Sequence, residues 1–423
     1  MKKKLLIILG AGSSVACGMP SVSDLETLIG KWSDDWAKIR RLSNHYRTLR
    51  ESIGKYYGSG AARPRSILNF EKVLGEMIAL SHWVTPAPFG DPLRQIACNG
   101  APPPDLRFAS ATWFDTPAPW AGTIEVTDQL TYLLIELARH FRSRCANAKA
   151  STEAFVSYGD LFSGLGSAFD LGIYNLNYDT LAELAVPQAF TGFDLQGNFA
   201  PAKVHRRKEW GFTYYVHGSV HHSLSLPAGE GPIVWRGDLR ADFNDGDPSN
   251  PRGRRSEDKS FPNTTLVAGG LKLDQLLVEP FHSLHSALVR HAYEADAILI
   301  GGYGFGDEHI NRALMNRVKD RTMERPPVMV LDKATDCAEP TFRRDDFWAT
   351  ELTRTLQAPR NSFQEPGAPE LLHAPSVLAA RAAFEVSRGC KVTLWHGGFV
   401  EATSRLDSIV AWLSTSDESV LAA

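Results

Sequence analysis

Four short stretches of the chain combine glycine with serine, asparagine, histidine or aspartate, residue types that could bind a nucleotide and act on it. They are Gly10 to Ser14, Asn177 to Asp179, His217 to Ser219 and Gly301 to Asn311. Each follows a short apolar run, an arrangement that predicts a strand ending in a polar loop. Ligands of open α/β sheets bind beyond the carboxyl ends of the strands, so we expect the four stretches to meet at one edge of a sheet.

The first stretch could hold a diphosphate, because a glycine turn lets backbone N–H groups approach phosphate oxygens at the start of a helix. It consists of Gly10, Ala11, Gly12, Ser13 and Ser14. The stretch departs from the dehydrogenase fingerprint, since its third glycine is Gly18 and no acidic strand end follows at the usual distance. A tight turn between a strand and a helix, without a ligand, explains the same residues equally well.

The second and third stretches carry side chains suited to ribose chemistry. The Asn177 amide can donate and accept hydrogen bonds, whereas Asp179 could simply cap a helix that begins at Thr180. His217 has a side chain that titrates near neutral pH, which suits a general base or a hydrogen bond to ribose. The other histidines show no spacing typical of a metal-ligand set, so we predict no metal.

The fourth stretch places small residues, an aromatic and polar groups after another apolar run. A flexible turn capped by Asp307 is the alternative interpretation. The apolar spacing of Ile310, Leu314 and Val318 predicts a helix directly after this turn.

Apolar runs predict strands at 5–9, 171–176, 214–216, 297–300, 328–331 and 391–395. Helical spacing predicts helices within 23–57, 66–83, 127–141 and 281–295, the first beginning at a capping box formed by Ser23 and Glu26. This alternation is typical of an α/β fold, a Rossmann-like doubly wound parallel sheet with an inserted helical layer. We expect one domain over 1–423, a helical insertion at approximately 23–150 and a mobile insertion at approximately 226–264.

Composition indicates an ordinary globular protein of 423 residues, with 43% apolar residues and a net charge of −3. This charge gives no reason to expect direct contact with nucleic acid or with an acidic membrane surface. The five cysteines form no Cys-x-x-Cys pair, which favours a reducing compartment, and no apolar run is long enough to cross a membrane. Lys2 to Leu9 imitates a signal peptide, but a buried strand explains these residues better, so we expect a cytoplasmic protein.

In this order, the four stretches resemble the sirtuin-like family, specifically its zinc-free bacterial branch associated with antiphage defence. Gly10 to Ser14 with Gly18 and Pro20 is similar to the opening glycine loop of that family. Asn177-Tyr178-Asp179 is similar to its Asn-x-Asp motif, His217-Gly218-Ser219 to its histidine motif, and Gly302 to Asn311 to its late glycine and aromatic signature.

The resemblance implies an enzyme that breaks the bond between nicotinamide and ribose in NAD, with Asn177 and His217 as the catalytic pair. It also implies residues that contact NAD, namely Gly10, Ala11, Gly12, Ser13, Ser14, Asp179, Gly302, Tyr303, Gly304, Phe305 and Asp307. It further implies a homo-oligomer and a separate sensor partner such as a HerA-like ATPase. Two departures stand out: Gly304 replaces a serine common in the family, and no Cys-x-x-Cys zinc module is present.

Alternatives to NAD hydrolysis remain open from the sequence. An NAD-dependent deacylase or ADP-ribosyltransferase would use the same cleavage but pass the ribosyl group to another acceptor. A catalytically silent sensor would bind NAD or ADP-ribose without cleaving it. An ordinary oxidoreductase is disfavoured because the dehydrogenase fingerprint is absent.

Overall fold

A computed structural model describes the chain over several ranges. These are 2–58, 68–83, 121–147, 152–225, 231–246, 254–256, 259–261, 264–269, 272–333, 346–364 and 384–421. Residues 84–120 and part of the insertion expected at 226–264 lie outside them. The expected mobility of that insertion therefore stays a prediction.

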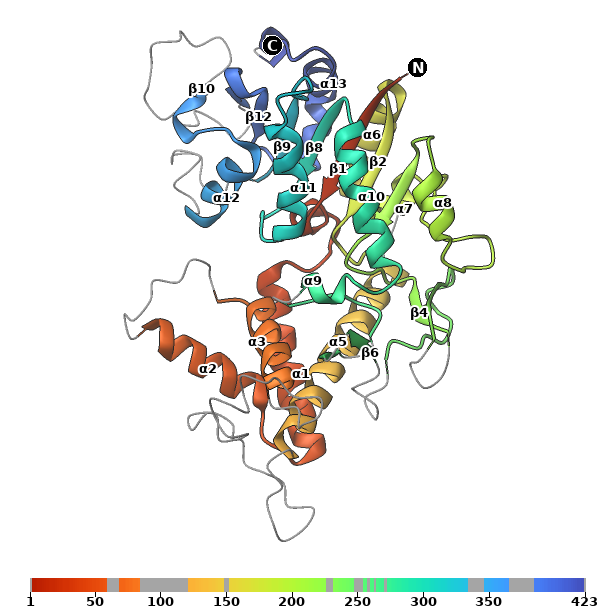
Figure 1. The fold of residues 1–423 in the computed structure, drawn as a ribbon, viewed down its shortest axis with the longest axis vertical. Helices are drawn as coiled ribbons and strands as arrows, with labels where there is room; N and C mark the ends of the chain where they lie inside the picture. The colour runs from red at the N-terminus through yellow and green to blue at the C-terminus, as the bar shows by residue number, and fades with distance from the viewer. Residues whose placement is uncertain are drawn as a thin grey trace.

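An eight-stranded sheet, in the order β10-β11-β12-β9-β8-β1-β2-β3, lies in the upper part of the molecule as drawn in Figure 1. The strands are β1 (Lys3–Leu9), β2 (Phe169–Asn175), β3 (Phe212–Tyr215), β8 (Ala297–Gly301), β9 (Val328–Leu331), β10 (Phe363–Gln364), β11 (Phe384–Ser387) and β12 (Val392–Trp395). Every pairing from β12 through β9, β8, β1 and β2 to β3 is parallel. The two pairings at the β10 edge are antiparallel. The predicted α/β fold with a mainly parallel sheet is confirmed, and the antiparallel edge is an addition to it.

The burial of strand β1 shows that helices cover both faces of the sheet. All five residues from Leu5 to Leu9 are buried, and they alternate between two hydrophobic cores. One core contains residues of α6 (Glu153–Ala168) and α13 (Leu406–Thr415). The other contains residues of α10 (Phe281–Glu294), α11 (Glu308–Lys319) and α12 (Asp346–Leu356). A continuous apolar run is what a parallel strand covered on both faces requires.

The chain reverses direction across the sheet between β1 and β8. From β1 it proceeds to β2 and β3 on one side, whereas β8, β9 and β12 follow on the other side. Such a reversal opens a crevice at the carboxyl ends of the two central strands, and this is where doubly wound proteins bind ligands. The topology therefore predicts a site at the ends of β1 and β8.

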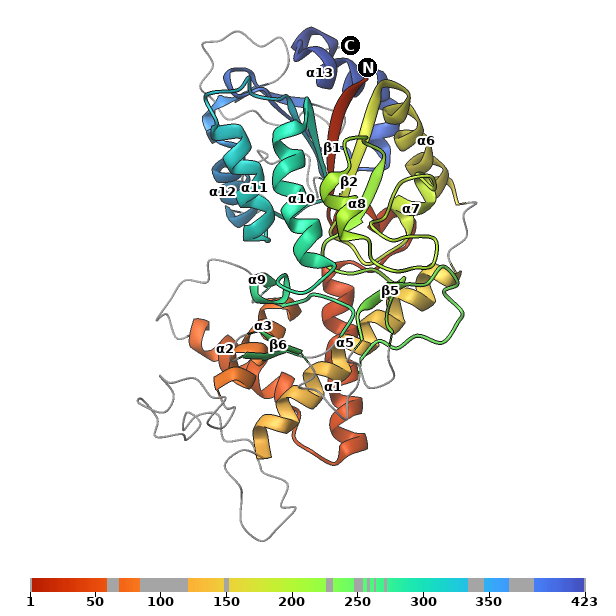
Figure 2. The ribbon, with the colours of Figure 1, turned by 45° about the vertical axis from the view of Figure 1, so that its right-hand side comes forward.

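Four helices gather beyond the carboxyl ends of the strands, on the side toward which β1 runs from the N-terminus (Figures 1 and 2). They are α1 (Val22–Arg40), α2 (His45–Gly58), α3 (Phe70–Trp83) and α5 (Ala121–Asn147). The capping box that begins α1 is formed by Ser21 and Asp24, so the prediction of Ser23 and Glu26 is wrong by two residues. Pro20 fixes the backbone just before this box, and Ser21 is the first residue that can cap the helix.

Shorter elements complete the described structure. They are α7 (Leu181–Ala185), α8 (Pro201–Arg206), α9 (Lys272–Gln275), β4 (His222–Leu224), β5 (Ile233–Trp235), β6 (Arg254–Ser256), β7 (Lys259–Phe261) and the 3-10 helices η1 (Ala11–Ser13), η2 (Val15–Cys17), η4 (Arg360–Ser362), η5 (Arg388–Cys390), η6 (Glu401–Arg405) and η7 (Glu418–Leu421). Within the described ranges, no helix has the length and apolar character needed to cross a membrane.

Candidate functional site

A cavity of about 380 Å³ opens at the carboxyl ends of β1 and β8, where the topology predicts a site. Its volume falls within the range of roughly 300–1,000 Å³ that is usual for small-molecule sites. The walls come from loops after β1, β2, β3 and β8, and also from α1, α3, α5 and α9 of the surrounding helices. The helices beyond the sheet edge therefore contribute to the wall of the cavity.

The loops after β1 and β8 lie in backbone contact. Gly10 N–H donates to Gly301 O at 2.9 Å, and Gly12 N–H donates to Gly302 O at 2.9 Å. Gly302 has a φ of +57°, and a Cβ atom there would lie 2.1 Å from Ser13 N. Because only glycine fits this conformation and this close approach, the two loops are fixed against each other at the crevice.

The first loop differs from the helix N-terminus that the sequence suggested. It continues into η1 and η2, and α1 begins only at Val22. The N–H groups of Ser13 and Ser14 already donate to Gly10 O and Ala11 O, so they are not directed at a ligand. Gly10, Ala11 and Ser14 line the cavity, whereas the exposed Gly12 and the buried Ser13 do not. A diphosphate here would meet side-chain and local backbone donors rather than the positive end of a long helix.

Asn177 ties the end of β2 to this first loop. Its Nδ2 donates to Gly10 O at 3.0 Å, Ser13 Oγ at 3.3 Å and Ser14 Oγ at 3.0 Å. Its Oδ1 accepts no hydrogen bond from the described residues, and the side chain lines the cavity. The Nδ2 group of Asn177 therefore holds the loop, whereas Oδ1 keeps its acceptor capacity beside the cavity.

Asp179 serves the local backbone and also borders the cavity. Its Oδ1 accepts from Leu181 N–H at 3.0 Å, which agrees with the capping interpretation. Its Oδ2 is buried and has no hydrogen-bond partner among the described residues. Burial raises the pKa of this carboxyl above its ordinary value, while hydrogen bonds from Ser14 and Leu181 oppose the rise.

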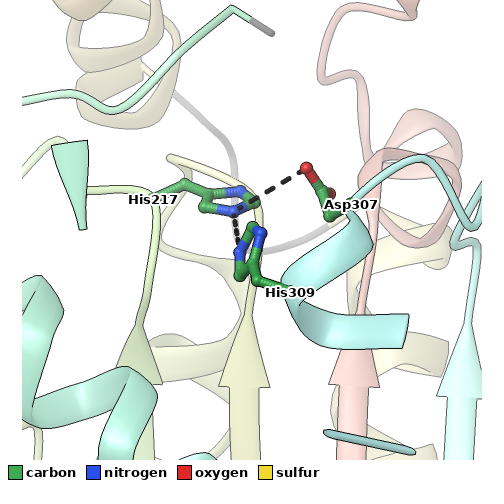
Figure 3. A group of neighbouring side chains, drawn as sticks. All are labelled: His217, Asp307 and His309. Carbon is green, nitrogen blue, oxygen red and sulfur yellow. Dashed lines mark hydrogen bonds and ion pairs between the residues drawn. The ribbon is translucent and has the colours of Figure 1, made fainter. Parts of the chain in front are cut away.

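His217 belongs to a buried group of three side chains, drawn in Figure 3. Its Nε2 lies 3.1 Å from Nε2 of His309 and 3.9 Å from Oδ1 of Asp307. Burial is the main cause that lowers the pKa of His217 well below its ordinary value, and the charge of Lys272 lowers it further. The imidazole is therefore neutral near pH 7 and able to accept a proton.

Lys272, a residue that sequence reasoning missed, lies in the wall of the same cavity. Its Nζ is 2.6 Å from Asp307 Oδ1 and 3.4 Å from Glu71 Oε1. Burial disfavours its charge, but the two carboxylates outweigh burial and raise its pKa above the ordinary value. Conversely, burial alone would raise the pKa of Asp307, but Lys272 and the neighbouring histidines lower it strongly. Asp307 therefore pairs with Lys272 and makes no side-chain cap to α11, contrary to the capping alternative.

The loop after β8 is held in shape by its own side chains. Tyr303 Oη donates to Asn311 Oδ1 at 2.9 Å and accepts from Asp307 N–H at 3.1 Å. Asn311 Nδ2 donates to Phe305 O at 2.8 Å, and Phe305 has an unusual φ of +54°. Phe305 is buried in the core beside α11 and does not line the cavity. The hydrogen bonds of Tyr303 and Asn311 thus stabilise a backbone that leaves Gly304 at the cavity surface.

The structure brings most of the predicted site residues together. The cavity wall includes Gly10, Ala11, Ser14, Asn177, Asp179, His217, Tyr303, Gly304 and Asp307. The predicted contacts that do not line the cavity are Gly12, Ser13, Gly302 and Phe305. Their positions indicate that they shape the loops, and the chemical roles of the whole set stay predictions.

Comparisons with known proteins found a family match over part of the chain. Residues 172–356 match the family described as SIR2-like domain. This range runs from β2 to α12 and includes Asn177, His217 and the loop after β8, but it is less than half of the chain and leaves out the loop after β1. The match supports the sirtuin-like resemblance over this range, and with it an enzymatic function related to NAD.

A search of solved structures also found similar chains. One, described as a mutant of Sir2 homologues in complex with 2'-O-acetyl ADP ribose, is 13% identical, covers 84% of this chain and 93% of its own, and has a TM-score of 0.33. No curated protein matches the sequence.

Proposed function

We propose that this protein cleaves the bond between nicotinamide and ribose in NAD and transfers the ADP-ribosyl group to water. The observation that carries the proposal is that Asn177 and His217, which follow two different strands, line one cavity at the crevice of a doubly wound sheet. An amide acceptor and a neutral imidazole beside one cavity are the two groups that hydrolysis of a ribosyl bond can use.

The described residues fit NAD as a substrate. Gly10, Ala11 and Ser14 are small residues in the cavity wall, beside which a diphosphate could lie. Asp179 also borders the cavity, where its carboxyl group could meet a ribose hydroxyl or an amide of the substrate. Met19, Leu25 and Phe141 add an apolar wall against which a nicotinamide or adenine ring can pack.

The chemistry that we propose places modest demands on the protein. The electron pair of the glycosidic bond moves to the nicotinamide nitrogen, which leaves as a neutral ring. Water forms the new bond to C1' of the ribose, and its proton passes to the His217 imidazole and then to solvent. Asn177 Oδ1 orients this water by accepting a hydrogen bond, and the enclosed cavity keeps the reacting groups in place.

Nicotinamide release from NAD by the purified chain tests this proposal. We expect Asn177→Ala to lower the rate by about 10²-fold or more, because the variant loses the acceptor for water and the three hydrogen bonds to the first loop. Asn44→Ala is a suitable control, because Asn44 makes its hydrogen bonds within the helices beyond the sheet edge. Intact NAD after long incubation with the wild-type chain would contradict hydrolysis and favour a silent sensor.

The acceptor and the biological setting are further parts of the proposal. Release of ADP-ribose in equal amount to nicotinamide would identify water as the acceptor, whereas ADP-ribose bound to protein or an acyl group would identify a transferase or deacylase. From the motif resemblance we also propose a cytoplasmic homo-oligomer that acts in bacterial antiphage defence with a sensor such as a HerA-like ATPase. Co-purification and a phage challenge with the Asn177→Ala variant test these assignments.

A further inference from the structure

A segment that the proposed mechanism does not use, residues 264–269, is buried along its whole length, and we call it the strap. At one end it approaches the loop after β3 so closely that a Cβ atom on Gly218 would lie 2.6 Å from Thr265 O. At the other end a Cβ atom on Gly269 would lie 2.9 Å from Gly75 N in α3. The strap therefore contacts both the loop after β3 and one of the helices beyond the sheet edge.

Tyr178 binds the strap through its hydroxyl group. Tyr178 Oη donates to Val267 O at 2.9 Å, and Val267 N–H donates to His217 O at 2.8 Å. The loop after β3 is also bound directly, because Val220 N–H donates to Tyr178 O at 2.9 Å. Since Tyr178 directly follows Asn177, these hydrogen bonds connect the loop that carries Asn177 to the loop that carries His217.

The orientation of the His217 ring depends on the same connection. The ring donates a hydrogen bond to the backbone carbonyl of Leu176, the residue before Asn177. Its Nε2 lies 3.1 Å from Nε2 of His309, a ring that burial keeps neutral by lowering its pKa to about 4. Nδ1 is therefore the nitrogen that donates to Leu176, and the lone pair of the neutral ring is on Nε2. A shift between the two loops would turn this ring relative to the Asn177 amide.

We propose that Tyr178 is a positioning residue whose hydroxyl, through the strap, fixes the His217 imidazole relative to the Asn177 amide. This inference rests on the proposed function. The amide that orients the attacking water and the imidazole that takes its proton keep one relative position while the hydroxyl is in place. Without the hydroxyl, Val267 O loses this donor and the strap can shift. Small displacements of reacting groups lower the rate of a reaction strongly.

The strap also sets the position of Lys272, because α9 begins with this residue shortly after the strap ends. Among the titratable groups around the His217 ring, Lys272 and His309 lower its pKa, and Asp307 raises it. Withdrawal of the Lys272 ammonium would therefore raise the pKa of His217. Since a protonated imidazole cannot act as a base, movement of the strap should cause activity to be lost at higher pH.

Tyr178→Phe in the full chain tests this role, because it removes the hydroxyl and keeps the ring that packs against Phe141. We expect kcat for nicotinamide release to fall by about tenfold, KM for NAD to change less than about twofold, and the acid limb to move up by about half a pH unit. Tyr174→Phe is the matched control. It also removes a buried hydroxyl, 2.8 Å from His291 Nδ1, but Tyr174 does not line the cavity. Its kcat and acid limb should stay at the wild-type values.

Gln275→Ala separates an effect through the strap from a direct contact with substrate. Gln275 Nε2 donates to Ala268 O in the strap at 2.9 Å, and Gln275 does not line the cavity, whereas Tyr178 does. We expect Gln275→Ala to lower kcat by about threefold and to move the acid limb in the same direction as Tyr178→Phe. Wild-type kcat and acid limb in Gln275→Ala, beside a loss in Tyr178→Phe, would assign Tyr178 to a direct substrate contact and overturn the proposal.

Amide hydrogen exchange gives a readout that does not depend on turnover. The Val267 amide should be protected in the wild type and exchange about tenfold faster in Tyr178→Phe, with no change in Tyr174→Phe. Equal exchange of this amide in the wild type and Tyr178→Phe would overturn the inference, as would a kcat and an acid limb in Tyr178→Phe that match those of Tyr174→Phe. Absence of nicotinamide release by the wild type, together with the expected exchange pattern, would defeat the proposed function and leave the connection of the two loops standing.

Discussion

Two buried histidines follow strands of the same sheet, but their surroundings differ. His217 comes after β3, lines the cavity and meets the neutral ring of His309. His396 comes after β12, where its Nε2 lies 3.3 Å from Glu385 Oε2 of the adjacent strand, and it is not part of the cavity wall. The comparison teaches that burial at a strand end does not identify a catalytic histidine. Of these two histidines, His217 alone lines the cavity, and this position is the ground for proposing it as the base.

The largest expected effect is a difference in activity between the alanine variants of these two histidines. We expect His217→Ala to lower kcat for nicotinamide release by about 10²–10⁴-fold, the usual contribution of a general base. His396→Ala should instead lower the free energy of unfolding by about 1–3 kcal/mol, because it removes a hydrogen-bond partner of a buried carboxyl group. Initial rates per folded molecule and urea unfolding curves measure both changes.

The opposite pattern would break the comparison. If folded His396→Ala lost activity as fully as His217→Ala, both strand ends would contribute to the reaction. If His217→Ala kept its rate, the base would have to be sought elsewhere in the cavity wall.

Lys272→Met should shift the pH dependence of nicotinamide release, because Lys272 acts on the pKa of His217. Lys272 lowers the pKa of His217, so its removal raises that pKa, and the ionised Asp307 left behind raises it further. A protonated His217 cannot act as a base, so activity should be lost at higher pH than in the wild type. The shift should be on the order of one pH unit, as expected for a nearby charge. Lys319→Met, at an exposed site in α11, is the control.

Rates of nicotinamide release between pH 4 and pH 9 measure this shift. The groups facing His217 that bear on the profile are Lys272, Asp307 and His309, with Glu71 beyond Lys272. An acid limb in Lys272→Met at the wild-type position would show that the lysine does not control the base.

The sequence predicted the sheet and the meeting of its polar strand ends because these features depend on local patterns. Five consecutive buried residues in β1 reflect burial on both faces, and glycine after β1 and β8 reflects the close contact of their loops. Helix α6 was not predicted, although Tyr158, Leu161, Phe162 and Leu165 follow helical spacing. Glycines within the same segment obscure this pattern, since glycine is a poor helix former.

Lys272 could not be assigned from its neighbours in the chain. It is a single charged residue between Leu271 and Leu273, a pattern that fits an exposed turn as well as a buried ion pair. Its partners, Glu71 and Asp307, are 201 and 35 residues away. The hydrogen bond between His217 and His309, which are separated by 92 residues, was hidden for the same reason. Contacts made only by folding set the electrostatics of the cavity, whereas local motifs set its location.

The smallest effect should come from Gly304, where the sequence departs from the serine common in the family it resembles. A Cβ atom at Gly304 would meet no atom within 4 Å, whereas one at the nearby Gly302 would lie 2.1 Å from Ser13 N. Gly304→Ser should therefore leave the free energy of unfolding within about 0.5 kcal/mol of the wild type. Its hydroxyl, at the cavity surface, should lower KM for NAD by about two- to tenfold, the effect of one additional neutral hydrogen bond. Gly304→Ala adds the carbon without the hydroxyl, so an equal change in both variants would assign the effect to packing and leave the hydroxyl without a role.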